Sequence, residues 1–186
     1  MAGNDRRLRQ QLETAGEVGD GYHHRMQAMH EANARRLREI ISEHGWPGRS
    51  LVGEDGAEAA WFIVQHSISE PDFMREAAVL LQHSTAERNA PAWHLAFLTD
   101  RIAFYEGRPQ RYGTQWDVDD DGTEVIWELE SPERVDDLRR EVGLPALSAR
   151  FPGAQWRRIL TRKPSAKRLR DFEEWARAIG WRKSTP

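Results

Sequence analysis

Cysteine is absent from this chain of 186 residues. Its absence excludes disulfides, thiolate zinc sites, iron–sulfur clusters and a cysteine nucleophile. Long apolar runs are absent too, since no stretch approaches the roughly 20 residues that span a bilayer. The first 20 residues contain no apolar segment like that of a signal peptide. These absences predict a cytoplasmic protein that does not associate with membranes.

Several motifs that mark large enzyme classes are also missing. The chain contains no Walker loop, no dinucleotide-binding glycine fingerprint, no GxSxG nucleophile elbow and no HExxH zinc motif. The sequence therefore predicts no redox cofactor and assigns no metal ligands.

Apolar side chains recur at steps of three or four residues over most of the chain, which predicts a mainly α fold. We expect helices over residues 5–14, 22–44, 54–67, 71–88, 91–105, 132–142 and 165–179. Gly45 and Pro47 should end the second of these helices, and a loop should follow to residue 53. The helix over 54–67 is apolar nearly all round, so we expect it to be the buried central helix.

The period of the pattern changes after residue 110. Residues 111–118 and 124–129 alternate like strands, and an Asp-rich turn ending at Gly122 lies between them. This predicts one small antiparallel β-hairpin at about residues 110–130. The turn also matches the letters of a calcium-binding loop, but strands rather than helices flank it, so we interpret it as an acidic turn.

The length favours one compact helical domain over residues 1–150, with an added helical extension over 151–186 packed on it. The chain carries a formal charge of −3, yet residues 154–186 hold ten Lys or Arg against three acidic residues. Such a basic helix could contact nucleic acid, or it could be the solvated face of an amphipathic helix. The oligomeric state is left open.

The strongest functional signal is His66, which follows Gln65 at the end of an apolar run. Burying an imidazole or an amide without a partner costs about 1–3 kcal/mol, so other groups must satisfy both side chains. A core histidine bonded to the backbone would do so, and so would a functional site.

Other helices interrupt their apolar stripes in the same way. His30 and Asn33 lie on one stripe of the helix over 22–44, and His94 shares a face with Arg101 on the helix over 91–105. If these groups converge, His66 or His94 can act as a base, Asp100 can orient the imidazole and Arg101 can hold an anion. A divalent metal is the rival use of such imidazoles and carboxylates, although no HxxxH or HxxE spacing supports one.

Several longer motifs resemble a bacterial family of unknown function, DUF6624. They are Gly45-Trp46-Pro47 with Ser50-Leu51-Val52-Gly53, Val64-Gln65-His66, Leu98-Thr99-Asp100-Arg101 and Tyr112-Gly113-Thr114-Gln115. The resemblance implies a helical domain and no established activity. It places emphasis on polar residues, namely Asn33, His66, Asp100, Arg101, Gln110, Tyr112 and Gln115. Polar motif residues on several elements are typical of a site, although they can also lock a scaffold together.

Two functions from different classes follow. The first is a small enzyme of the acid–base type, without a cofactor, acting on a small polar substrate in a pocket around His66. Its catalytic residues would be His66, Asp100 and Tyr112. Substrate would contact His30, Asn33, Gln65, His94, Arg101, Gln110 and Gln115. The second is a non-catalytic binding module that uses the basic carboxy-terminal helix or the same pocket.

Overall fold

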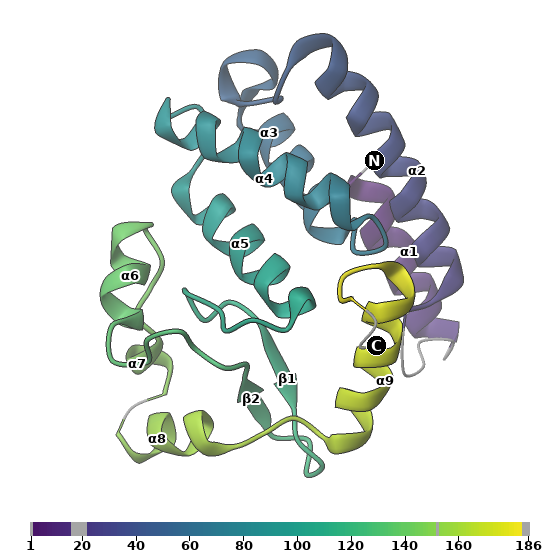
Figure 1. Ribbon diagram of the computed structural model, residues 1–186. Coiled ribbons are helices and arrows are strands. Elements are labelled where there is room, and N and C mark those ends of the chain that lie inside the picture. The colour runs from purple at the N-terminus through teal and green to yellow at the C-terminus, as the bar shows by residue number, and fades with distance from the viewer. Residues whose placement is uncertain (1, 16–21, 152, 184–186) are drawn as a thin grey trace. The chain divides into compact units, whose positions relative to one another are not determined.

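The computed structural model describes residues 2–15, 22–151 and 153–183. Within these ranges the chain forms nine helices and one two-stranded sheet (Figure 1). The chain divides into two compact units, Met1–Ala90 and Pro91–Pro186. The mainly helical fold with a hairpin is therefore confirmed. Among the described helices, none combines the length and apolarity needed to cross a membrane.

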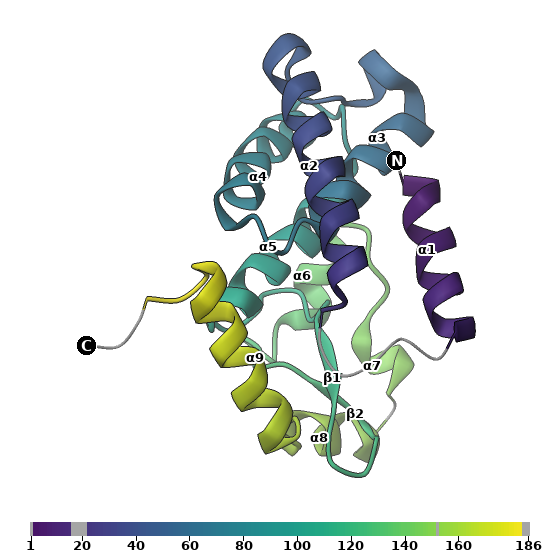
Figure 2. The same ribbon diagram turned by 90° about the vertical axis from the view of Figure 1, so that its right-hand side faces the viewer.

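The first unit contains four helices, each close to a predicted one. They are α1 (Ala2–Ala15), α2 (His24–His44), α3 (Arg49–His66) and α4 (Pro71–Ala86). Helix α1 packs against both α2 and α3, and Figure 2 shows it running beside α2. Helices α1, α2 and α3 therefore pack against one another.

Helix α2 ends where the sequence predicts. The backbone N–H of Gly45 donates to the carbonyl of Ile41, and Gly45 has a φ of 74°, which favours glycine. The buried residues of α2 are Met26, His30, Ala34 and Leu37. Their spacing is that of one helical stripe, so His30 points into the core of the unit.

Helix α3 corrects the predicted loop over residues 46–53. One helical turn begins at Arg49, and a break follows at Gly53, whose φ is 71° and ψ 178°. The backbone N–H of Arg49 and that of Ser50 donate to the backbone oxygen and Oδ1 of Asn89, respectively. A partner 39 residues away explains this turn, and local spacing could not reveal it.

The prediction that this helix is buried nearly all round was also wrong. Ala57, Ala60, Ile63, Val64 and Gln65 are buried. Trp61 and Phe62 are only half-buried, and Glu58 is exposed. One side of α3 therefore faces the core.

The second unit contains α5 (Ala92–Glu106), β1 (Trp116–Val118), β2 (Glu124–Ile126), α6 (Val135–Glu141), α7 (Leu147–Arg150), α8 (Ala154–Thr161) and α9 (Ala166–Ile179). Strands β1 and β2 pair antiparallel, with Trp116 opposite Ile126. In Figure 1 the hairpin lies between α6–α8 on one side and α9 on the other. A core of Ile126, Leu129, Val135, Leu147 and Ile159 joins β2 to α6, α7 and α8.

The hairpin is shorter than predicted. Residues 111–115 form no strand; beyond β2 the hairpin continues only as a Trp127 N–H bond to the Gln115 carbonyl and a bridge between Gln110 and Leu129, among the contacts of the described residues. Side chains of α5 and of the loop itself bind the backbone of this segment, as described below. These hydrogen bonds replace the ladder that a longer strand would make.

Helix α9 begins one residue after the predicted start at Ser165 and ends at Ile179, followed by the left-handed C-cap Gly180, whose φ is 92°. Residues 153–183 belong to the second unit together with residues 91–150. The carboxy-terminal segment is therefore built into the same compact unit as the hairpin. Helices α7 and α8 were not predicted, because each is no longer than eight residues.

Candidate functional site

Three side chains of the first unit meet around one carboxylate oxygen. Oδ2 of Asp5 lies 2.5 Å from Nε2 of His30 and 2.8 Å from Nδ1 of His66. Asp5 and His30 are buried, with side-chain exposures of 4% and 6%, whereas His66 keeps 22% of its side chain exposed. We call Asp5, His30 and His66 the carboxylate–imidazole cluster.

Helical spacing positions each member. Asp5 lies on the same stripe of α1 as Leu8 and Leu12, so the apolar side of this helix carries its carboxylate inward. His30 lies on the buried stripe of α2. His66 is the last residue of α3 and follows buried Ile63 by three positions. The cluster thus joins three helices of one unit.

The carboxylate stays ionised and one imidazole stays neutral at pH 7. Burial acts to raise the pKa of Asp5, but the hydrogen bonds and charges of His66 and His30 outweigh it and hold this pKa below 3.8. Burial lowers the pKa of His30 below 6.5; the Asp5 carboxylate opposes this effect, and Arg9 adds to it. A neutral imidazole therefore sits against an anion.

Tyr22 completes the surroundings of His30. Its hydroxyl lies 2.5 Å from Nδ1 of His30, and the two rings stack with centroids 5.7 Å apart. A neutral His30 that donates from Nε2 to Asp5 accepts the Tyr22 proton at Nδ1. Both ring nitrogens are then satisfied, as a buried histidine requires.

These shifts predict how stability depends on pH. Both groups have a lower pKa in the folded protein than in the unfolded chain, so protonation favours unfolding. We expect the free energy of unfolding to fall as the pH drops below 6.5, through His30, and to fall further below 3.8, through Asp5. Denaturant unfolding at several pH values measures this slope. The slope of the free energy of unfolding against pH should flatten between pH 7 and 5 in His30→Gln. An equal slope in the wild type and in His30→Gln would contradict the role given to His30.

A second polar network fixes the loop after α5 in the second unit. The fully buried carboxylate of Asp100 accepts the backbone N–H groups of Arg111, Tyr112 and Thr114 at 2.8–3.1 Å. It also accepts the Thr114 hydroxyl at 3.0 Å. Both oxygens of Asp100 are thus engaged with the loop.

Two further side chains hold the same loop. Gln110 donates to the carbonyls of Gln115 and Trp127 and accepts the backbone N–H of Gln115. Arg139 donates to the carbonyls of Pro145 and Tyr112, at 2.6 and 2.7 Å. The Gln110 amide and the Arg139 guanidinium each join two backbone segments by hydrogen bonds.

The structure therefore brings the predicted site residues together in two groups. His30 and His66 meet in the first unit, whereas Asp100, Gln110, Tyr112 and Gln115 form the loop network of the second. Of the others, Asn33 is half-buried on α2, Gln65 is buried on α3, His94 is buried on α5, and Arg101 is half-buried on α5. That the side chains of His66, Asp100 and Tyr112 lie together in one site stays a prediction.

Two members of the site, Asp5 and Tyr22, were missed. The signal for Asp5 was present, since it stands three and seven residues before Leu8 and Leu12 on the short first helix. A carboxylate on an apolar stripe is the same kind of interruption that singled out His66. Nothing in the local sequence marks Tyr22, because its partner His30 lies eight residues further on.

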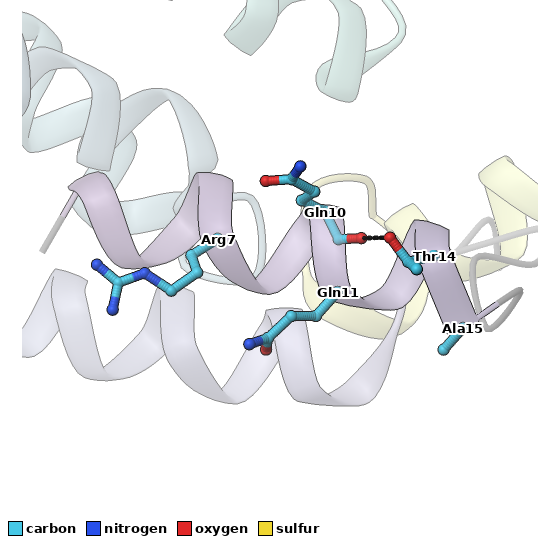
Figure 3. Close-up of a pocket in the computed structure, with 5 residues that line it drawn as sticks. All are labelled: Arg7, Gln10, Gln11, Thr14 and Ala15. Atoms are coloured by element: carbon cyan, nitrogen blue, oxygen red, sulfur yellow. Dashed lines mark hydrogen bonds between the residues drawn. The ribbon is translucent and has the colours of Figure 1, made fainter.

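A surface pocket of about 400 Å³ lies on α1, lined among the described residues by Arg7, Gln10, Gln11, Thr14 and Ala15 (Figure 3). All five are exposed. At about 100° per residue they lie on the side of α1 opposite Asp5. This pocket is therefore separate from the carboxylate–imidazole cluster.

The acidic turn of the hairpin faces basic residues of the carboxy-terminal segment. Asp119 pairs with Arg162, and Oδ1 of Asp117 lies 2.9 Å from Arg168. Backbone N–H groups of Asp121 and Thr123 also donate to Asp119. These contacts fit the interpretation of residues 117–122 as an acidic turn.

Fold and site together define a mainly helical protein with a buried carboxylate–imidazole cluster in its first unit. The chain belongs to the family of unknown function DUF6624, whose model matches residues 1–152. The resemblance seen in the sequence is thereby confirmed. Comparison with curated proteins and with solved structures gives no match.

Proposed function

We propose that the protein is an enzyme that transfers protons on a small polar substrate, in a reaction of the hydrolase, lyase, isomerase or cyclase type. His66 is the proton acceptor or donor, and Asp5 orients it. The observation that carries the proposal is the 2.8 Å contact between Nδ1 of His66 and Oδ2 of Asp5. Asp5 takes the orienting role that sequence reasoning gave to Asp100.

The chemistry follows from the tautomer that this contact selects. A carboxylate that accepts Nδ1–H holds the other ring nitrogen, Nε2, as the basic one, and it stabilises the imidazolium formed after proton transfer. Asp5 is shielded from water, whereas His66 retains 22% side-chain exposure. An oriented base that remains reachable beside a buried carboxylate suits general acid–base catalysis.

Other predicted residues have supporting roles in this proposal. His30 shares the Asp5 oxygen and fixes the carboxylate, and Asn33, half-buried one turn along α2, is a substrate anchor. Gln65, His94 and Arg101 stay predicted substrate contacts, and Tyr112 stays a predicted catalytic residue. The reaction needs no redox cofactor, and the lack of cysteine favours the cytoplasm as its location.

Binding of nucleic acid through the basic carboxy-terminal helix has less support. Arg168, Lys167 and Arg177 pair with the carboxylates of Asp117, Asp171 and Glu173, respectively. Cations already matched by the chain's own acids offer less charge to phosphates.

The test is consumption of small polar metabolites by the full-length protein, followed by mass spectrometry. We expect the wild type to consume at least one compound and His66→Gln to consume it about 10²–10⁴-fold more slowly, as loss of a general base implies. His83→Gln is the matched control, because His83 is an exposed histidine on α4. Equal rates for His66→Gln and the wild type would overturn the proposal.

A further inference from the structure

We infer that the carboxylate–imidazole cluster is a binding site for one divalent transition-metal ion, with Zn²⁺, Fe²⁺ and Mn²⁺ as the candidate ions. The ligands are Oδ2 of Asp5, Nε2 of His30 and Nδ1 of His66. The inference rests on the proposed function, since it names the cofactor that the same site takes.

The donor set selects this class of ion. Two imidazoles and one carboxylate that leave open positions are a common arrangement for catalytic zinc and for non-haem iron. Calcium and magnesium prefer all-oxygen sites, which two imidazoles do not provide. The chain has no cysteine that could supply a competing thiolate site.

The donor atoms already lie near the spacing that an ion requires. All three lie within 4.8 Å of one another. With metal–ligand bonds of about 2.1 Å, ligand atoms are separated by about 3.0 Å at right angles and about 3.4 Å in a tetrahedron. The contacts of 2.5 and 2.8 Å to Asp5 need to widen by less than about 1 Å. Three side chains on three helices can make this adjustment by small rotations.

Each imidazole can bind the ion without losing its proton, because the proton can move to the ring nitrogen that does not bind the ion. When Nε2 of His30 and Nδ1 of His66 become ligands, each neutral imidazole carries its proton on its other nitrogen. For His30 that nitrogen is Nδ1, 2.5 Å from the Tyr22 hydroxyl. A hydroxyl can accept this proton as readily as it can donate to the metal-free ring, so Tyr22 supports both forms.

The Tyr22 hydroxyl would therefore hydrogen-bond to His30 and orient its imidazole as a metal ligand. Outer-shell residues of this kind typically contribute about 10–100-fold to metal affinity. In the metal-loaded site, His66 would be a ligand rather than the base of the metal-free reaction, and a water molecule held by the ion would take over the proton transfer.

Zinc titration of the full-length protein by calorimetry, after removal of metals with a chelator, tests the inference. We expect one equivalent of Zn²⁺ to bind to the wild type and to His83→Gln with equal affinity. Asp5→Asn, His30→Gln and His66→Gln should each lose at least about 100-fold, because a lost ligand costs more than a lost outer-shell partner. A Co²⁺ titration should give a visible absorption band in the wild type and in His83→Gln, and in none of the three ligand variants.

Tyr22→Phe keeps the test decisive if a ligand variant fails to fold. It retains the aromatic ring, and we expect it to bind zinc about 10–100-fold more weakly than the wild type. Affinity that is unchanged in Tyr22→Phe and in the folded ligand variants would overturn the inference, and so would the absence of zinc binding to the wild type.

The same experiments separate the inference from the proposed function. Substrate consumption by chelator-treated protein that binds no zinc would contradict the metal site and support metal-free acid–base chemistry. Stoichiometric zinc binding at the cluster, together with no consumption of any metabolite, would support the metal site and contradict the proposed function.

Discussion

Replacing Asp100 by alanine is expected to lower the free energy of unfolding by about 3–5 kcal/mol. The substitution removes the acceptor for three backbone N–H groups and one hydroxyl of the loop that follows α5. Each donor left without a partner costs about 1–3 kcal/mol when it stays out of water, and partial exposure of the loop limits the sum. Denaturant unfolding followed by circular dichroism measures the loss.

Two matched variants make this result specific. Asp137→Ala removes an exposed carboxylate that pairs only with Arg140 on the same helix, among the contacts recorded for it, and should change stability by less than about 1 kcal/mol. Asp100→Asn keeps one acceptor oxygen, so its loss in the free energy of unfolding should lie between those of Asp100→Ala and Asp137→Ala. A loss below about 1 kcal/mol in Asp100→Ala would show that the hydrogen bonds of this carboxylate do not hold the loop.

Replacing Asp5 by asparagine is expected to slow substrate consumption by about 10²–10⁴-fold. The amide keeps the shape of the side chain but loses the charge that stabilises a protonated His66. It can also turn its NH₂ group toward Nδ1 and select the opposite tautomer. The rate is measured on the compound that the metabolite experiment identifies, at a temperature where circular dichroism shows the variant folded.

Glu13→Gln is the control for this change. Glu13 is an exposed carboxylate on the same helix as Asp5, so neutralising it changes the net charge equally and leaves the cluster intact. We expect the rate of Glu13→Gln to match that of the wild type. A similar loss in both variants would assign the effect to net charge rather than to the orientation of His66.

Elements with a strong local signal could be predicted closely. The last helix has an N-cap at Ser165, buried Ala176 and a left-handed Gly180 at its end, and its predicted bounds differ from α9 by one residue. The end of α2 at Gly45 was predicted for the same reason. In these places short-range sterics and the helical period determine the structure.

Elements that depend on distant partners could not be predicted. Residues 111–115 have the composition of a strand, yet the Asp100 carboxylate and the Gln110 amide bind their backbone. The helical turn beginning at Arg49 depends on Asn89 in the same way. Such hydrogen bonds join residues that local patterns treat as independent.

The candidate site shows the same division. His30 and His66 could be predicted, because each interrupts an apolar stripe of a long helix. Asp5 interrupts an apolar stripe in the same way, but this stripe consists of few residues on a 14-residue helix of low hydrophobicity, so its signal is weaker. Asp5 lies 61 positions from His66 in the sequence, and tertiary packing brings the two side chains together.

The central claim is that Asp5 and His66 act as one unit, and a double-variant cycle tests it most directly. The measurement is the kcat/KM of Asp5→Asn, His66→Gln and the double variant on the compound that the wild type consumes. Residues that act together give a double variant about as slow as His66→Gln alone, because the orienting carboxylate has no role once its imidazole is gone. A double variant slower by the product of the two single effects would contradict the claim.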